Sequence, residues 1–185
     1  MHSKSISPTK LMTTKDGTPV LGFAAFSGTG KTTLLEQIIQ RLRQADYHVG
    51  VLKQSHHNVE VDTPGKDSFR LRKAGASQTL LSSPYRQVLI KESDTTIEPE
   101  LDEILLMFDS QELDIILIEG FKYSAFTKIE LQREALGKPL LYLKDDTIVA
   151  LATDAMNQPH SVPVLDINNI ETIVDFLLKN ILQNE

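Results

Sequence analysis

A glycine-rich segment near the start of the chain has the residue types that hold nucleotide phosphates. Residues 25–33 are AFSGTGKTT. In the phosphate-binding P-loop, a glycine and four free positions precede Gly-Lys-Ser/Thr. Ala25 replaces the first glycine here, and Gly30, Lys31 and Thr32 complete the pattern. The segment therefore predicts a P-loop with one small departure, and the competing interpretation is an ordinary glycine-rich turn between a strand and a helix.

The residue types in this segment have separate physical roles. Gly28 and Gly30 let the backbone adopt positive φ and approach a phosphate without a Cβ in the way. Lys31 supplies a positive charge for the β- and γ-phosphates and is predicted to be a catalytic residue, and Thr32 supplies a hydroxyl for Mg²⁺. The N–H groups of the turn and of the following helix favour an anion. The residues expected to bind nucleotide are Ser27, Gly28, Thr29, Gly30, Lys31, Thr32 and Thr33.

A carboxylate at the end of an apolar run is the second candidate. Residues 114–119 are DIILIE, and Gly120 follows them. Apolar residues at successive positions favour a central parallel strand that is covered on both faces. P-loop proteins need a carboxylate near Mg²⁺ and the γ-phosphate. We therefore expect Glu119 to be a catalytic residue and a metal ligand, against the alternative that the strand ends in Glu by chance.

A polar segment follows the second predicted strand. Residues 53–65 are KQSHHNVEVDTPG, and ligands of open parallel sheets bind beyond the carboxyl ends of the strands. His56 and His57 are candidate contacts for a bound nucleotide or another anionic partner. No third ligand follows at a zinc-site spacing, and a solvated pair of histidines is the alternative.

The same segment continues into DTPGKDS, residues 62–68. Lys66 and Ser68 lie near a predicted helix start, where they are candidates for binding a second phosphate. Asp62 is a candidate to hold Mg²⁺ or to orient a water, and so is predicted as catalytic and metal-binding. Helix capping and a solvated surface are the alternative. The stretch lacks a preceding strand and the inner glycines, so we do not predict a second P-loop.

The elements that position these side chains follow from hydrophobic periodicity. The β-turn-α-β order at the start predicts a right-handed crossover and a parallel sheet. The expected fold class is α/β, a P-loop NTPase fold with a mainly parallel central sheet flanked by helices. Strands are predicted at residues 20–25, 48–52, 77–82, 87–91, 114–119, 128–131, 140–143, 147–152 and 162–165. Helices are predicted at 32–44, 64–73, 98–108 and 170–182, the last capped by Asn168.

Length and composition limit the class of protein. A chain of 185 residues favours one domain, which we expect over 19–185 after a flexible N-terminal extension, 1–18. The net charge of −6 argues against nonspecific binding to nucleic acid or to anionic membranes. The absence of cysteine excludes disulfides and thiolate chemistry. No apolar run approaches the ~20 residues of a membrane span, and no signal peptide is visible, so we expect a cytoplasmic protein.

Three segments together resemble the MobB family of molybdopterin-guanine dinucleotide biosynthesis. They are AFSGTGKTTL, KQSHHNVEVDTPGKDSFRLRKAGA and DIILIEGFK, and the resemblance extends from about Val20 to the C-terminus. It implies a P-loop GTP-binding adapter protein with weak Mg²⁺-dependent GTP hydrolysis, in the same broad class as dethiobiotin synthetase and the MinD-like ATPases. It also implies a homodimer that works beside the MobA nucleotidyltransferase, which joins GMP to molybdopterin. Direct contact of molybdopterin with this chain is left open.

The resemblance assigns roles by position. The P-loop roles apply to residues 27–33, and the acidic strand end is Glu119. Many members have His where this chain has Gln54, which leaves the role of Gln54 open. The middle motif corresponds to His56, His57, Asp62, Gly65, Lys66, Asp67 and Ser68.

No motif marks the residue that binds the guanine base. GTPases commonly carry Asn/Thr-Lys-x-Asp, and residues 143–146 (LKDD) have the Lys-x-Asp part without the Asn. A tight turn is the expected structure there. Asp154, just beyond the strand that ends in ALAT, is a better placed candidate for nucleotide binding. The preference for GTP therefore depends on the resemblance.

Three functions are compatible with these residues. The first is a GTP-binding accessory protein with slow hydrolysis, and the second is a small-molecule kinase or ligase of the dethiobiotin synthetase type. The third is an adaptor for which the nucleotide is only a conformational ligand. An efficient enzyme usually needs an arginine finger. Arg70 and Arg72, on the predicted helix 64–73, are candidates, with a solvated helix surface as the alternative.

Overall fold

Residues 11–55, 57–95 and 97–182 are described in the computed structural model of the chain. They form two compact units. The larger unit contains residues up to 54 and from 101 onwards, and the smaller unit contains residues 55–100. The sequence predicted one domain over 19–185 and did not indicate this division.

The larger unit is built on a seven-stranded sheet. Its strands lie in the order β3-β6-β2-β7-β8-β9, and β1 pairs with β2 outside this path. All the pairings along the path are parallel, which confirms the predicted mainly parallel sheet. The strands are β1 (Met12–Thr13), β2 (Pro19–Ala25), β3 (Val49–Lys53), β6 (Ile115–Glu119), β7 (Lys128–Gln132), β8 (Ile148–Thr153) and β9 (Val164–Asp166).

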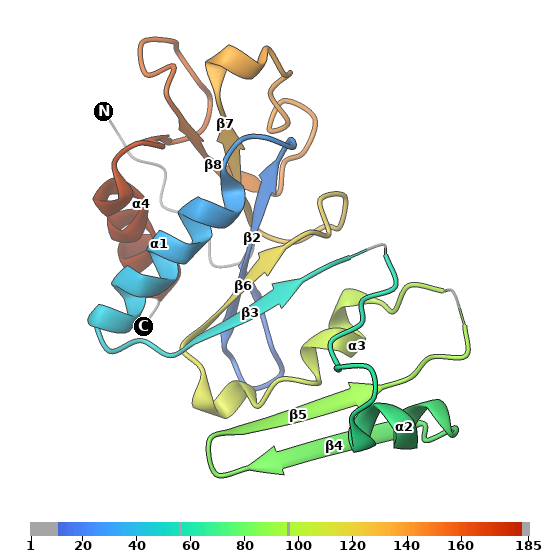
Figure 1. Cartoon of the computed structure of the whole chain (residues 1–185). Coiled ribbons are helices and arrows are strands. Elements are labelled where there is room, and N and C mark those ends of the chain that lie inside the picture. Colours follow the sequence, from blue (N-terminus) through green and yellow to red (C-terminus); the bar gives the residue numbers. More distant parts are fainter. Residues whose placement is uncertain (1–10, 56, 96, 183–185) are drawn as a thin grey trace. The chain divides into compact units, whose positions relative to one another are not determined.

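Helices cover both faces of this sheet. Helices α1 (Lys31–Gln44) and α4 (Ile170–Leu177) lie on one face, and α3 (Leu101–Leu105) lies on the other (Figure 1). A π-helical turn, Leu178–Leu182, continues α4. Two short 3₁₀ helices, η2 (Ser110–Glu112) and η3 (Glu134–Leu136), lie in the connections.

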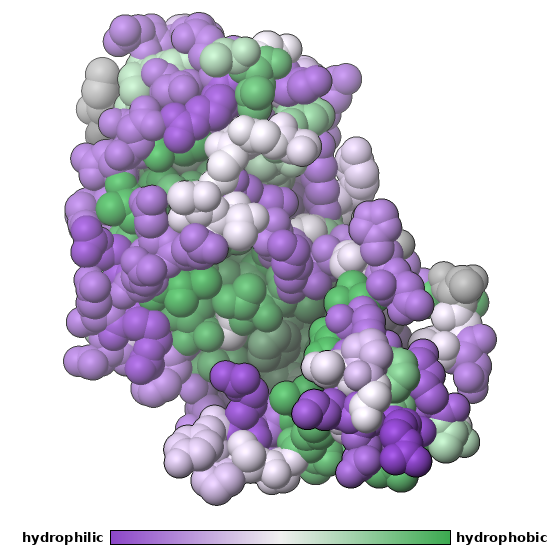
Figure 2. All heavy atoms as spheres, viewed as in Figure 1, coloured by the Kyte–Doolittle hydropathy of each residue, from purple (hydrophilic) through white to green (hydrophobic). Residues whose placement is uncertain are grey.

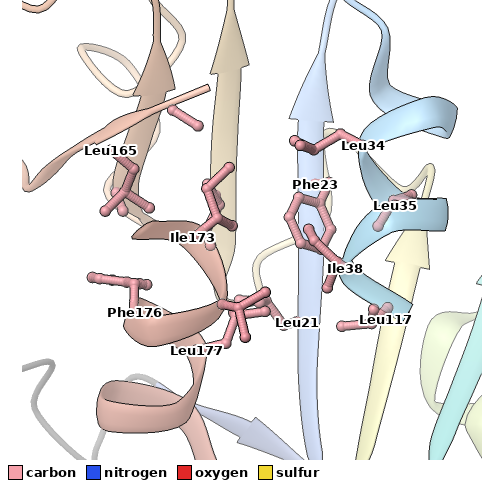
Figure 3. Packing of buried hydrophobic residues seen from close by; sticks show 14 of the residues in the cluster. Leu21, Phe23, Leu34, Leu35, Ile38, Leu117, Leu165, Ile173, Phe176 and Leu177 are labelled. Atoms are coloured by element: carbon pink, nitrogen blue, oxygen red, sulfur yellow. The ribbon is translucent and has the colours of Figure 1, made fainter. Parts of the chain in front are cut away.

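The main core lies between the sheet and the two helices α1 and α4. Leu21 and Phe23 of β2 pack there against Ile38 of α1 and against Ile173 and Leu177 of α4 (Figure 3). Each of these five side chains is at most 1% exposed. Burying one such side chain contributes roughly 1.5–3 kcal/mol. The apolar face of α1 therefore fixes the helix that begins directly behind the predicted P-loop.

Strand β7 buries two charged side chains on the opposite face. Lys128 and Glu130 are each 1% exposed. The Lys128 Nζ lies 3.1 Å from Asp145 Oδ2. The carboxylate of Glu130 accepts hydrogen bonds from the backbone N–H groups of Leu141 and Tyr142, at 2.8 and 2.9 Å. Burial raises the pKa of Glu130, and these two N–H groups only partly oppose that change.

This carboxylate explains why the strand predicted at 140–143 is wrong. Residues 141–144 form a bend and a turn, although their leucines and tyrosine are typical of a strand. The N–H groups of Leu141 and Tyr142 donate to Glu130, so they are not available for a neighbouring strand. Local propensity is here overridden by a buried side chain.

The end of the chain also differs in detail from the expectation. The cap of α4 is Asn169, whose side chain accepts the N–H of Glu171. The predicted cap, Asn168, instead accepts a hydrogen bond from Arg133 Nη1 at 2.5 Å. The helix predicted at 98–108 is shorter, because only 101–105 is α-helical.

The smaller unit contains one helix and one hairpin. Helix α2 (Asp67–Lys73) precedes the antiparallel strands β4 (Gln78–Ser83) and β5 (Arg86–Lys91). The helix begins later than predicted, because Gly65 has a φ of 90° and residues 64–65 form a turn.

The side chain of Arg72 holds this unit together. It is 6% exposed and pairs with the carboxylates of Glu60 and Glu92, the latter at 2.6 Å. Its hydrogen bond lowers the pKa of Glu60, and the two carboxylates raise the pKa of Arg72. The clamp connects the segment before α2, the helix itself and the residue after β5.

The N-terminal segment contains a short strand. Residues 12–13 form β1 and pair with β2, within a segment that we expected to be flexible throughout.

Hydrophobic side chains gather at the surface along β3 (Figure 2), an edge strand of the sheet on which Val51 is 45% exposed. Among the described residues, no helix has both the length and the apolar character needed to cross a membrane.

Candidate phosphate-binding site

The loop between β2 and α1 lies at the carboxyl edge of the sheet. Strands β2 and β6 are parallel neighbours, and Phe23 pairs in register with Glu119. The loop that follows β2 and the carboxylate that ends β6 therefore lie side by side. Gly28 and Gly30 both have a φ of 85°, as their residue type predicted, and a Cβ on Gly30 would meet no atom within 4 Å. The loop leaves open space where a ligand can approach the backbone.

A pocket of about 530 Å³ opens at this loop. It is lined by all the residues that the sequence predicted for the P-loop and by Glu119. The lining residues are Ala25, Phe26, Ser27, Gly28, Thr29, Gly30, Lys31, Thr32, Thr33 and Glu119.

The carboxylate of Glu119 lies beside a hydroxyl and an ammonium group that suit a phosphate and its metal ion. Its Oε1 lies 3.3 Å from the Thr32 hydroxyl, which donates to it, and 3.6 Å from Lys31 Nζ. The side chain is 16% exposed. Mg²⁺ prefers hard oxygen ligands and keeps some of its waters. The Thr32 hydroxyl and the Glu119 carboxylate fit such an ion, and Lys31 fits the phosphate beside it.

Sequence reasoning missed a second lysine at this carboxylate. Lys53, the last residue of β3, pairs in register with Glu119, and its Nζ lies 3.5 Å from Glu119 Oε2. Only the general rule that ligands bind beyond the strand ends pointed to this position. The spacing between residues 53 and 119 has no local pattern, because tertiary pairing of β3 with β6 brings them together.

Gln54 fixes the turn that follows Glu119. Its N–H donates to the Glu119 carbonyl at 2.9 Å, and its side-chain Oε1 accepts the N–H of Phe121 at 2.6 Å. Gly120 has a φ of 123°, and a Cβ there would lie 2.5 Å from the Cβ of Gln54. The close approach requires glycine at 120 and gives Gln54 the structural role that the sequence left open.

The predicted residues of the DTPGKDS stretch lie in the smaller unit. Asp62 Oδ1 accepts hydrogen bonds from the Ser68 hydroxyl at 3.0 Å and from the N–H of Thr63 at 2.8 Å. Its Oδ2 is buried and has no hydrogen-bond partner among the described atoms. Lys66 is exposed and directly precedes α2. Binding of metal or phosphate by these residues stays a prediction.

The two histidines stay predictions as well. His57 is exposed, and its N–H donates to the Ser55 hydroxyl at 3.2 Å. His56 lies outside the described residues. Within the described ranges, no group of three or more His, Asp or Glu side chains is arranged to hold a metal.

The arginine-finger candidates have partners within the smaller unit. Arg72 is held between Glu60 and Glu92, so its side chain has a structural role in this arrangement. Arg70 is 75% exposed and lies 3.5 Å from Asp67, one turn away on the same helix.

The guanine candidates lie at different edges of the sheet. Asp145 belongs to the turn before β8, where it pairs with Lys128 and Thr147, which confirms the tight turn expected there. Asp154 directly follows β8 at the carboxyl edge. It accepts the N–H of Glu134 at 2.9 Å and pairs with Arg133 at 3.4 Å. These contacts lower its pKa. Its contact with a base stays a prediction.

Comparison with known proteins identifies a family that this chain matches. The model of the family described as MobB, Molybdopterin guanine dinucleotide synthesis protein B, matches residues 20–154. The molybdopterin-guanine dinucleotide biosynthesis adapter protein of Escherichia coli K12 is 42% identical over 163 residues, which is 87% of this chain and 92% of the relative. The protein of the same name from Haemophilus influenzae is 41% identical over 161 residues, 86% and 87% of the two chains.

A solved structure agrees with these sequence matches. The crystal structure of Bacillus subtilis MobB is similar with a TM-score of 0.70 at 26% identity, covering 90% of this chain and 99% of that one.

Proposed function

This chain belongs to the MobB family of molybdopterin guanine dinucleotide synthesis proteins, and we propose from this premise that it is a GTP- and Mg²⁺-binding adapter. The resemblance seen in the three sequence segments is confirmed. The named relatives support an adapter role in molybdopterin-guanine dinucleotide biosynthesis. The proposal adds GTP as the nucleotide, weak Mg²⁺-dependent GTPase activity and a MobA-type nucleotidyltransferase as the partner.

One observation supports nucleotide binding above the others. Lys31, Thr32 and Glu119 line one pocket, and the Lys31 ammonium group and the Thr32 hydroxyl both lie within 3.6 Å of the Glu119 carboxylate. In the proposal, Lys31 binds the β- and γ-phosphates, and the first N–H groups of α1 add a positive dipole end. Thr32 and Glu119 hold Mg²⁺, which when bound neutralises charge on the phosphate oxygens.

The surroundings of the pocket support slow hydrolysis. Among the described residues, no arginine lines the pocket. An arginine finger contributes a factor of ~10³–10⁵ to turnover in related chemistry. A binding role with weak turnover is therefore proposed in preference to efficient catalysis.

We also propose a homodimer and a cytoplasmic location. Leu80 and Leu89 stand directly opposite each other on β4 and β5, and they are 63% and 48% exposed. A second copy of the chain can cover such an apolar pair. The absence of cysteine suits a reducing compartment.

The remaining sequence candidates keep their proposed roles. These candidates are His56, His57, Asp62, Lys66, Ser68 and Asp154. The two histidines, Lys66 and Ser68 are contacts for the nucleotide or for another anion, Asp154 is a nucleotide contact, and Asp62 is a Mg²⁺ ligand or the residue that orients a water.

A titration with GTP and with ATP in the presence of Mg²⁺, followed by turnover measurements, tests the proposal. We expect binding of GTP in preference to ATP and slow hydrolysis, measured with and without the nucleotidyltransferase. Tight ATP binding with a rate that depends on a metabolite would support the kinase or ligase alternative. Binding without turnover, even with the partner present, would support a purely conformational role for the nucleotide.

A further inference from the structure

Two lysines approach opposite oxygens of one carboxylate in the pocket. Lys31 Nζ lies 3.6 Å from Glu119 Oε1, and Lys53 Nζ lies 3.5 Å from Glu119 Oε2. They come from different elements, the start of α1 and the end of β3. Two ammonium groups around one carboxylate leave an excess of one positive charge, which favours a further anion.

The position of Lys53 is fixed by its backbone. It pairs in register with Glu119, and the next residue, Gln54, donates its N–H to the Glu119 carbonyl. The side chain itself is 62% exposed, against 23% for Lys31. The backbone of Lys53 is therefore held in place by strand pairing, while its exposed ammonium group can exchange one partner for another.

The strand order tells which part of a nucleotide Lys53 would meet. Strand β6 lies between β3 and β2, so Lys53 reaches Glu119 from the side opposite the loop that follows β2. The carboxylate at such a strand end lies near Mg²⁺ and the γ-phosphate. A lysine on its far oxygen is thus close to the end of the phosphate chain, whereas Lys31 serves the β- and γ-phosphates from within the loop.

We propose that Lys53 is a second phosphate-binding lysine, which pairs with Glu119 in the free protein and with the terminal phosphate of bound GTP. The exchange follows from charge, because a carboxylate that holds Mg²⁺ is a weaker partner for a lysine. The affinity of the site then depends on the third phosphate. This inference rests on the proposed nucleotide binding and adds a residue that distinguishes a triphosphate from a diphosphate.

The competing role for Lys53 is purely structural. As a counter-ion it would keep Glu119 in place, and its loss would weaken every Mg²⁺-nucleotide alike. Affinities for two nucleotides that differ only in the third phosphate separate these roles, and they do not depend on turnover.

The experiment measures the dissociation constants of Mg²⁺-GTP and Mg²⁺-GDP by calorimetry for the full chain and for Lys53→Ala. The expected loss of GTP affinity is on the order of tenfold, since the contact is charge-assisted but partly exposed to water. GDP affinity is expected to change by less than about twofold, since the lost contact is to a phosphate that GDP lacks. Lys53→Arg keeps the charge and is expected to restore most of the difference between GTP and GDP.

Lys179→Ala is the matched control. Lys179 is 68% exposed and lies 3.8 Å from Asp175, so its removal changes the net charge equally but leaves the pocket alone. Circular dichroism verifies that all three variants are folded.

Three outcomes are decisive. A selective loss of GTP affinity in Lys53→Ala supports the inference. An equal change for GTP and GDP, or no change, overturns it while leaving nucleotide binding in place. Failure of the unmodified protein to bind either nucleotide would remove the proposed function and this inference together.

Discussion

At the scale of single residues, the proposed site is defined by the contacts that Lys31 and Lys53 make with the Glu119 carboxylate. Lys31 and Glu119 were predicted from the sequence, because the motif and the apolar strand mark their positions. Lys53 was not, since its pairing with Glu119 depends on strand register. The sequence identifies those residues of such a site that belong to a local pattern. Residues that strand pairing brings to the site are identified only from the fold.

Replacing Lys31 by Ala is expected to weaken nucleotide binding at least ~100-fold, because charge-assisted contacts to phosphate are among the strongest polar interactions. Calorimetry with Mg²⁺-GTP measures the effect, and Lys179→Ala is again the control. Unchanged affinity in the Lys31 variant would refute the assignment of the loop.

Replacing Glu119 by Gln is expected to remove the Mg²⁺ dependence of GTP binding. The amide is a weaker ligand for Mg²⁺ than the carboxylate, so affinity in the presence of Mg²⁺ falls. Without the metal, affinity rises, because a negative charge beside the phosphates has been removed.

Titrations in Mg²⁺ and in EDTA measure both effects. Glu112→Gln, at an exposed position in η2, is the control for charge. If the Glu119 variant kept the full effect of Mg²⁺, the carboxylate would not be a metal ligand.

At the scale of elements, periodicity predicted the framework of the site well. The predicted bounds of β2, β6 and α1 agree with the structure to within one residue. Strongly apolar runs and a clear amphipathic period fit no other secondary structure as well. The turn at 141–144 was misjudged as a strand, because its N–H groups are taken by Glu130. No local sequence pattern indicates that the buried carboxylate of Glu130, on β7, accepts hydrogen bonds from these N–H groups.

Replacing Glu130 by Ala is expected to lower the free energy of unfolding by about 2–4 kcal/mol. The change leaves the N–H groups of Leu141 and Tyr142 without their acceptor and creates a cavity. Chemical denaturation measures it. Glu36→Ala, at an exposed position of α1, is expected to be nearly neutral, and equal stability of the two variants would contradict the buried role of Glu130.

The clamp at Arg72 is expected to weaken in acid. Hydrogen bonding to Arg72 lowers the pKa of Glu60 below its usual value of 4.5. A lowered pKa in the folded state means that the stability from this pair is present above pH 4.5 and is lost as the pH falls through the folded-state pKa.

An NMR titration of the Glu60 carboxyl group tests this expectation, together with amide protection of the β4–β5 hairpin. In Arg72→Ala the midpoint should return toward 4.5. Arg70→Ala, which alters an exposed arginine of the same helix, should leave it unchanged. A midpoint that did not respond to Arg72 would disprove the clamp.

At the scale of the whole molecule, the sequence predicted the fold class but not the division into two units. The parallel sheet follows from the order of strands and helices along the chain. The separation of residues 55–100 does not, because its clamp joins three residues of ordinary type, Glu60, Arg72 and Glu92. The composition also gave no indication that leucines of the β4–β5 hairpin are exposed.

The proposed dimer is expected to have twice the chain mass of 20.7 kDa in light scattering coupled to size-exclusion chromatography. Leu80→Glu should convert it to the monomer, because a charge cannot be buried unpaired in an apolar contact. Leu143→Glu is the control, since Leu143 is similarly exposed, at 67%, but lies outside the hairpin. A dimer that persists in the Leu80 variant would exclude this surface as the interface.

The strand order has a consequence for synthesis on the ribosome. Strand β2 is made early, yet both of its parallel neighbours, β6 and β7, come from beyond residue 114, with Val20 pairing with Ile116. Contacts so distant along the chain delay folding, and chains emerge from the N-terminus at ~5–20 residues per second. For several seconds the glycine-rich loop after β2 therefore lacks the neighbouring strands β6 and β7, while the hairpin at residues 78–91 can already form. A nascent chain cannot complete the proposed nucleotide site until most of its length has been translated.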